Sequence, residues 1–212
     1  MKDLVRRGYD VCGSAYLEDI ADSERPEVRR LVKLLPARAR VLDVGCGMGE
    51  PVTRMLVEGG CEVTAIDLSS AQIRLARERL PGVAFVHADV MDASVRFPPA
   101  AFDGVVACYV ITHIPRDQHA DLFTRLAGWL KPGGLLLCTV GLGDLPGHTT
   151  AHYHGAPMFW NHFDLPTSQR LIEAAGLLIL ETIIDRRNDE PQPIILALKP
   201  EAPGWENQMG LA

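Results

Sequence analysis

The sequence predicts an α/β fold in which helices cover both faces of a doubly wound, mostly parallel sheet. Three observations support this class. Short apolar segments alternate with amphipathic helical segments, two strand-like segments near the end are too close together to run parallel, and the composition is that of a folded domain. Of 212 residues, 47% are hydrophobic and 23% are charged, so we expect one domain with one core.

The strands are predicted from short, continuous apolar runs. Such runs are typical of strands that are buried on both faces of a parallel sheet. They cover residues 41–44, 63–66, 83–86, 104–110 and 135–140.

The segments between these runs have helical spacing. Residues 69–80 begin with Ser69, and Gln72 follows three positions later, which is the pattern of a capping box. Residues 117–130 carry an apolar stripe, and Pro132 prevents this helix from continuing. Strand and helix therefore alternate, which favours right-handed crossovers and parallel pairing.

Both ends of the chain depart from this alternation. Residues 177–187 and 193–200 are strand-like but only five residues apart, and a parallel connection needs a dozen or more, so they must pair antiparallel. Residues 1–36 predict two short helices, the second from Pro26, which we expect to form a lid. Residues 37–200 would then be the catalytic core and 201–212 a tail.

The charge and cysteine content exclude several classes of partner. Lys and Arg number 21 against 27 Asp and Glu, a net charge of −6, which disfavours nucleic acid. The longest apolar run is too short to span a membrane and no export leader is evident, so we expect a cytoplasmic protein. Five cysteines without a C-x-x-C pair are expected to be reduced. A monomer or homodimer is expected.

A glycine-rich turn follows the first strand. Residues 41–50 lead from the strand into Gly45-x-Gly47-x-Gly49, and a helix is predicted from Pro51. Glycines at this junction allow a ligand to approach the backbone, and the helix amino terminus offers unpaired N–H groups. The turn alone is weak evidence for a binding site.

Two acidic residues at the ends of the next strands strengthen this interpretation. Asp67 ends the second strand, where a carboxylate can accept hydrogen bonds from both ribose hydroxyls, and Asp89 ends the third, where it can accept from an adenine amine. Together with the turn they predict a nucleoside site. NAD is the second candidate, but its fingerprint requires glycine where this chain has Glu50.

The motifs together resemble class I S-adenosylmethionine-dependent methyltransferases, closest to the small-molecule branch typified by ubiquinone-biosynthesis enzymes. The resemblance covers roughly residues 8–199 and rests on the glycine turn, Asp67, Asp89, the segment 102–114 and LKPGG at 130–134. It implies a Rossmann-like seven-stranded sheet whose last strand inserts antiparallel. It also implies S-adenosylmethionine as cofactor and methyl transfer to a small-molecule acceptor.

The same resemblance implies which residues bind the cofactor. Their expected partners run from the methionine end, through the ribose, to the adenine, with one aromatic residue in the lid. In that order they are Asp43, Gly45, Gly47, Tyr109, Asp67, Leu68, Gln72, Asp89, Val90 and the lid residue Tyr16.

Methyl transfer is an in-line displacement that depends mainly on alignment, and a base helps when an oxygen or nitrogen nucleophile carries a proton. His113 follows the fourth strand and is the first candidate base, with a structural role as the alternative. His152 and His154 lie in a long loop, 148–162, that we expect to form the substrate wall. No metal is expected, because this loop contains no carboxylate.

Two other functions stay open on the sequence alone. One is an NAD-dependent reductase, which shares the glycine turn and the ribose acid. The other is a non-catalytic module that binds the nucleoside cofactor as a sensor. Among methyl acceptors, O- and N-nucleophiles are favoured over carbon.

Overall fold

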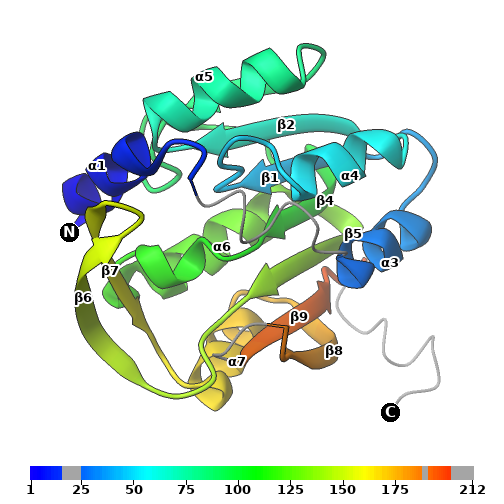
Figure 1. Cartoon of the computed structure of the whole chain (residues 1–212). Helices are drawn as coiled ribbons and strands as arrows, with labels where there is room; N and C mark the ends of the chain where they lie inside the picture. The colour runs from blue at the N-terminus through cyan, green and yellow to red at the C-terminus, as the bar shows by residue number, and fades with distance from the viewer. Residues whose placement is uncertain (16–24, 188–190, 202–212) are drawn as a thin grey trace.

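The computed structural model describes residues 1–15, 25–187 and 191–201, and its centre is a seven-stranded sheet (Figure 1). The strand order is β3-β2-β1-β4-β5-β9-β8. Strands β3 to β5 pair in parallel, and β9 pairs antiparallel with both β5 and β8. The mixed sheet and its reversed C-terminal pair are as predicted. The strands are β1 (Arg40–Val44), β2 (Glu62–Asp67), β3 (Ala84–His87), β4 (Phe102–Ala107), β5 (Leu130–Thr139), β8 (Leu178–Asp185) and β9 (Gln192–Leu198).

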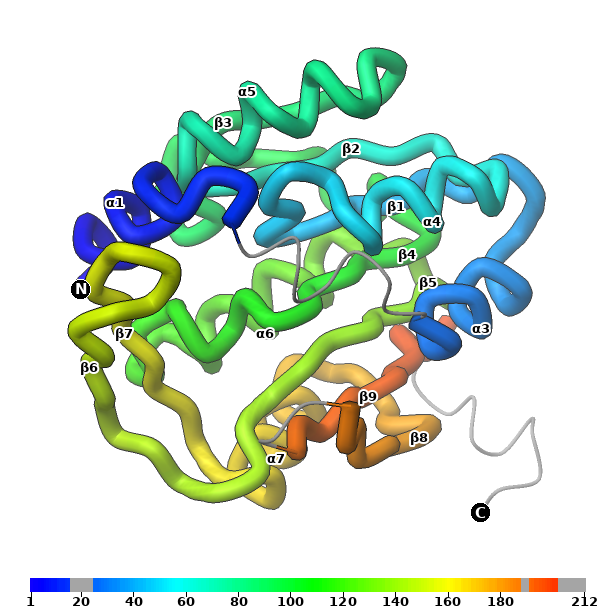
Figure 2. Tube along the Cα trace, viewed as in Figure 1, coloured from blue at the N-terminus to red at the C-terminus, as the bar shows by residue number. Residues whose placement is uncertain are grey.

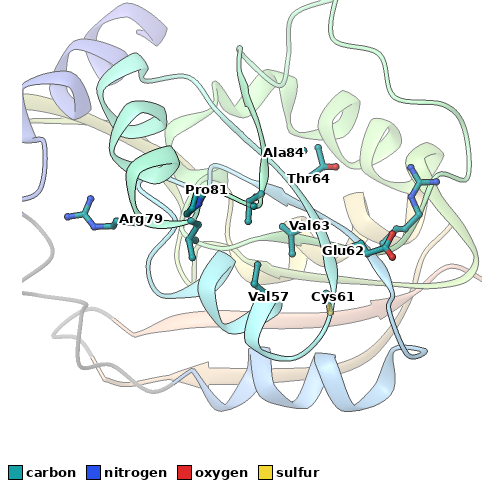
Figure 3. A pocket seen from close by; sticks show the side chains of 12 residues that line it. Val57, Cys61, Glu62, Val63, Thr64, Arg79, Pro81 and Ala84 are labelled. Atoms are coloured by element: carbon teal, nitrogen blue, oxygen red, sulfur yellow. The ribbon is translucent and has the colours of Figure 1, made fainter.

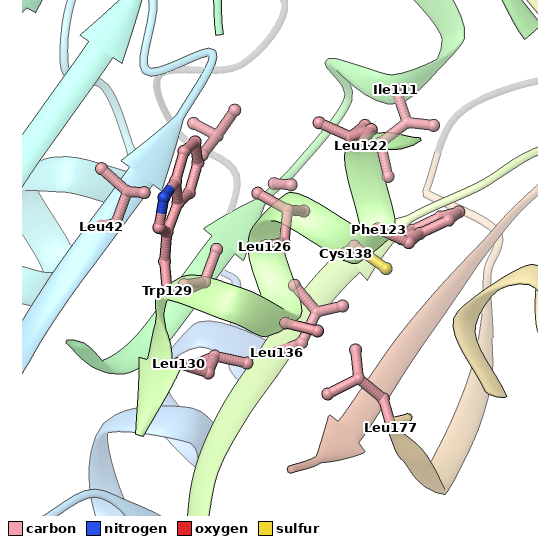
Figure 4. Close-up of a cluster of buried hydrophobic side chains, with 14 of the residues drawn as sticks. Leu42, Ile111, Leu122, Phe123, Leu126, Trp129, Leu130, Leu136, Cys138 and Leu177 are labelled. Atoms are coloured by element: carbon pink, nitrogen blue, oxygen red, sulfur yellow. The ribbon is translucent and has the colours of Figure 1, made fainter. Parts of the chain in front are cut away.

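Helices cover both faces of this sheet, which confirms the doubly wound prediction. One buried cluster joins helices α3, α4 and α5 to the sheet, and a second joins α6 and α7 to its other face. In Figure 4, Leu122, Phe123 and Leu126 of α6 point toward the sheet side chains Leu42 and Leu136. The helices are α3 (Pro26–Leu34), α4 (Val52–Glu58), α5 (Ser70–Arg79), α6 (His119–Trp129) and α7 (Leu165–Ala174).

The start of α5 differs in one detail from the predicted capping box. The Ser69 hydroxyl accepts a hydrogen bond from the Gln72 N–H at 3.2 Å, as a capping box requires. The Gln72 side chain does not return to Ser69 but donates to carbonyls of the first helix. The Ser69 N–H instead donates to the Asp67 carboxylate.

The fourth strand is shorter than predicted. It ends at Ala107 rather than at residue 110, because Tyr109 adopts a left-handed backbone with φ 58°. The Tyr109 N–H donates to the Thr139 hydroxyl, and a short 3-10 helix, η1 (Ile111–His113), follows. The break directs the chain across the carboxyl edge of the sheet.

The long loop predicted after β5 is a β-hairpin, so that prediction is wrong. Strands β6 (Leu145–Tyr153) and β7 (Ala156–His162) pair antiparallel as a separate two-stranded sheet. His154 and Gly155 form the turn with φ of 46° and 87°, the two positive values that a tight type I′ hairpin turn requires.

The first helix, α1 (Lys2–Cys12), lies beside this hairpin at the carboxyl edge of the sheet (Figure 2). Gly8 permits the close contact, because a Cβ there would lie 2.7 Å from the Met158 methyl carbon of β7. The predicted lid residue Tyr16 lies outside the described residues. Among the residues that are described, no helix has the length and apolar character needed to span a bilayer.

Candidate cofactor and active site

The glycine turn after β1 is held by the acidic residue at the end of β2. Gly45 and Gly47 have φ of 72° and 54°, and a Cβ on Gly45 would lie 2.4 Å from the Val110 side chain. The Asp67 carboxylate accepts hydrogen bonds from the Gly47 N–H at 2.9 Å and the Ser69 N–H at 2.7 Å. Burial raises the Asp67 pKa, and these two donors oppose the rise.

Asp43 lies below the turn and is almost fully buried. Its carboxylate accepts a hydrogen bond from the Thr53 hydroxyl at 2.5 Å. Burial raises the Asp43 pKa to about 7; the Thr53 hydrogen bond opposes this and the nearby Asp67 charge adds to it. Asp43 can therefore gain or lose a proton near neutral pH.

Two adjoining pockets open at this edge of the sheet. They enclose about 360 Å³ and about 70 Å³ and have five lining residues in common. The shared residues are Tyr9, Gly45, Asp67, Val110 and His113. The larger pocket is also lined by the predicted residues Asp43, Gly47 and Tyr109, and the smaller by Leu68, Asp89 and Val90.

Asp89 lies at the smaller pocket in contact with the first helix. Its Oδ2 pairs with the Lys2 ammonium at 2.8 Å, and its Oδ1 accepts from the Met91 N–H at 2.9 Å. Val90 and Leu68 provide apolar wall beside it. A flat apolar base with a polar edge fits this combination.

Gln72 is fully buried but lies outside both pockets. Its Nε2 donates to the carbonyls of Tyr9 at 3.1 Å and Gly13 at 2.7 Å. Asp10 makes the reciprocal contact, accepting from the Ser69 hydroxyl at 2.7 Å and the Ala71 N–H at 3.2 Å. These contacts fasten α1 to the start of α5.

His113 reaches the junction of the two pockets with both ring nitrogens engaged. Nδ1 lies 2.8 Å from the Phe159 carbonyl, which can only accept, so Nδ1 carries the proton. Nε2 therefore accepts from the Tyr9 hydroxyl at 2.9 Å. Burial lowers the His113 pKa to about 4, and the bond to Phe159 opposes this. His113 is neutral at physiological pH.

The other two candidate bases do not line either pocket. His152 is exposed on β6, and His154 lies in the hairpin turn against the Tyr153 ring. The hairpin instead contributes Tyr153 and Trp160, whose rings pack edge to face with centroids 5.3 Å apart. Within the described part of the chain, no His, Cys, Asp and Glu side chains gather into a metal-binding group.

A polar cluster at the far end of the larger pocket was not predicted from the sequence. The Tyr109 hydroxyl donates to Asp185 at 2.8 Å, and the Arg25 guanidinium lies 5.1 Å from the centre of the Tyr109 ring. Arg187 binds both Asp185 and Glu27 at 2.7 Å. Burial raises the Tyr109 pKa, so its phenol stays protonated.

A more voluminous pocket lies at the opposite edge of the sheet (Figure 3). It encloses about 570 Å³ and is lined by Glu62 and Ala84, which begin β2 and β3, and by Val57 of α4. Ligands of open α/β sheets bind outside the carboxyl ends of the strands. We therefore place the functional site at the glycine turn.

The fold and this site define a nucleoside-binding α/β protein. Asp67 and Asp89 can hold the hydroxyls and amine of an adenosine between apolar walls, and the larger pocket extends beyond it toward Arg25. This arrangement fits S-adenosylmethionine, whose methionine arm extends from the ribose. Residues 41–134 match the family model of a methyltransferase domain.

Named relatives agree with this match. The chain is 38% identical over 123 residues to 27-O-demethylrifamycin SV methyltransferase of Amycolatopsis mediterranei, covering 54% of this chain and 42% of that protein. It is 37% identical over 169 residues to trans-aconitate 2-methyltransferase of Acidovorax sp., covering 78% of this chain and 62% of that protein. The match thus spans roughly half of each relative's length.

Solved structures show the same fold. An S-adenosylmethionine-dependent methyltransferase from Methanosarcina mazei has a TM-score of 0.72 at 20% identity, covering 85% of this chain and all of that one. A 1,6-didemethyltoxoflavin-N1-methyltransferase from Burkholderia thailandensis, with bound S-adenosylhomocysteine, has a TM-score of 0.63 at 24% identity, covering 90% and 88%. The chain belongs to the class I S-adenosylmethionine-dependent methyltransferases.

Proposed function

We propose that the protein transfers a methyl group from S-adenosylmethionine to an oxygen or nitrogen atom of a small molecule. The observation that carries this proposal is the continuous pocket formed by the glycine turn, Asp67 and Asp89. Relatives named for methylating a rifamycin and trans-aconitate support a small-molecule acceptor.

Bound S-adenosylmethionine supplies an electrophilic methyl group on a positively charged sulfur. Asp67 would bind the ribose hydroxyls, and Asp89 with Val90 would hold the adenine. Asp43 would lie beside the methionine end. These contacts fix the donor so that the acceptor can approach in line, which is the main requirement of a displacement.

The acceptor would bind against the aromatic wall formed by Tyr153 and Trp160. Helix α1, fastened by Gln72, would act as a lid that keeps water out. We assign His113 a positioning role, because it orients the Tyr9 hydroxyl through the bond to Nε2. Its low pKa makes it a weak base.

A labelled-methyl assay tests this function directly. The full chain is incubated with methyl-labelled S-adenosylmethionine and a library of phenols, alcohols, carboxylic acids and amines. Transfer of label to at least one small acceptor, inhibited by S-adenosylhomocysteine, is the expected result. Binding of S-adenosylhomocysteine without transfer to any acceptor would favour the non-catalytic module instead.

The reductase alternative is tested by cofactor preference. Calorimetry should detect S-adenosylhomocysteine binding and no NADH binding. The same fold is found in a [4+2]-cyclase, SpnF, with a TM-score of 0.66 at 20% identity, so the acceptor assay and not the fold decides the reaction.

A further inference from the structure

Two side chains at the far end of the larger pocket have buried polar atoms without a hydrogen-bond partner. They are the Arg25 Nε, on a residue with 4% of its surface exposed, and the Gln192 Oε1. Both residues line the pocket that contains the glycine turn. Buried polar atoms are normally paired, and leaving a charged one unpaired costs more than leaving a neutral one.

The carboxylates near Arg25 bind a different cation. Arg187 binds Asp185 through Nε and Nη2 and also binds Glu27. Across residues 1–15, 25–187 and 191–201, no carboxylate forms an ion pair with Arg25, whose recorded contact is the Tyr109 ring. The guanidinium is therefore held in position by stacking while its donors face the pocket.

The two atoms have opposite requirements. The Arg25 Nε needs an acceptor and favours an anion, whereas the Gln192 Oε1 needs a donor. A carboxylate alone would satisfy the first and leave the second unmatched. An amino-acid end, with a carboxylate and an ammonium on one carbon, satisfies both.

We propose that Arg25 and Gln192 form the subsite for the amino-acid end of the cofactor, with Arg25 binding the carboxylate and Gln192 accepting from the ammonium. This inference rests on the proposed function. It defines the direction of the cofactor across the sheet, with adenine at Asp89 and carboxylate at Arg25, and it leaves the aromatic wall for the acceptor.

The test compares three ligands by calorimetry on the full chain. S-adenosylhomocysteine has the complete amino-acid end, its decarboxylated analogue keeps the amine alone, and methylthioadenosine lacks both groups. The wild-type protein should prefer S-adenosylhomocysteine over the decarboxylated analogue by about tenfold to a hundredfold, the range for hydrogen bonds to a charged group.

Arg25→Gln should abolish this preference and leave methylthioadenosine affinity unchanged. The matched control is Arg30→Gln on the same helix, because Arg30 pairs with Glu181 outside the pocket. Gln192→Leu should weaken both amine-bearing ligands without affecting methylthioadenosine. Melting temperatures verify that each variant is folded, and the wild-type comparison does not depend on them.

Three results would overturn the proposal. The first is an equal affinity of the wild-type protein for S-adenosylhomocysteine and its decarboxylated analogue. The second is an Arg25→Gln variant that keeps the wild-type preference; a raised KM for a carboxylate-bearing acceptor would then identify the acceptor as the ligand of Arg25. The third is a wild-type protein that binds none of the three ligands, which would overturn the methyltransferase function as well.

Discussion

Asp67 makes two kinds of contact. Its carboxylate accepts from the backbone of Gly47 and Ser69 and also lines both pockets. A ligand's ribose would therefore bind to a group that the protein already holds in place, which limits the entropy lost on binding. This explains why the acid at the end of β2 was a reliable sequence signal.

Asp67→Ala should weaken S-adenosylhomocysteine binding by about 1–3 kcal/mol, the cost of ribose hydroxyls left without an acceptor. Calorimetry measures the change, and thermal melting detects any loss of the glycine turn. Asp67→Asn, which keeps one oxygen, should lie between the two. An unchanged dissociation constant in the alanine variant would remove Asp67 from the site.

Asp43 predicts a pH dependence of cofactor binding. Its pKa of about 7 means that it is mostly protonated below pH 7. A ligand ammonium favours the ionised form, so affinity for S-adenosylhomocysteine should rise from pH 6 toward pH 8 and then level off. Asp43→Asn should bind more weakly and without this dependence. A wild-type affinity that falls over this range would contradict the assignment.

His113 predicts a pH dependence of stability. Its folded pKa of about 4 is below the usual value near 6.5, so the unfolded chain binds more protons between these limits. Stability is therefore lost as pH falls from 6.5 to 4, by up to about 1.4 kcal/mol per pH unit. The stability advantage over His113→Gln should shrink across this window in urea titrations.

His152→Gln is the matched control for that experiment, because His152 is exposed. Its stability relative to wild type should not change with pH. A constant difference between wild type and His113→Gln from pH 7 to 4 would show that His113 is not a buried neutral residue.

Sequence reasoning identified acids and glycines at strand ends more readily than contacts between distant residues. Asp43, Gly45, Asp67 and Asp89 follow from motif spacing. Arg25 and Gln192 do not, because they meet only after the reversed strand β9 is placed beside β5. No short motif encodes that contact.

At the scale of elements, the strands of the parallel core followed directly from the apolar runs, but the hairpin β6 and β7 did not. The β6 side chains are mostly exposed, so the apolar alternation of a half-buried strand is missing. The local signal was His154-Gly155, whose left-handed backbone forms the turn. Histidine at that position is not a usual turn residue.

The attachment of α1 can be tested through Gln72. Gln72→Leu removes both side-chain bonds to the helix and leaves the Tyr9 and Gly13 carbonyls without this donor. We expect faster hydrogen exchange in α1 and weaker S-adenosylhomocysteine binding, with the rest of the sheet unchanged. Gln169→Leu on α7, which loses a bond to Thr182, should alter neither property. Unchanged exchange in α1 would contradict the attachment.

At the scale of the whole molecule, the sheet topology brings the ends of β1, β2 and β3 to one edge, and α1 with the hairpin lies over it (Figure 1). The break at Tyr109 and the reversed β9 extend the pocket toward Arg25. The fold thus supplies one continuous cleft with a nucleoside end and an amino-acid end.

The most direct test of this account is a crystal structure of the full chain with S-adenosylhomocysteine. It should show the ribose hydroxyls on Asp67, the adenine beside Asp89 and Val90, and the sulfur facing the wall of Tyr153 and Trp160. A ligand bound elsewhere, or bound at this edge with its ribose away from Asp67, would contradict the central claim.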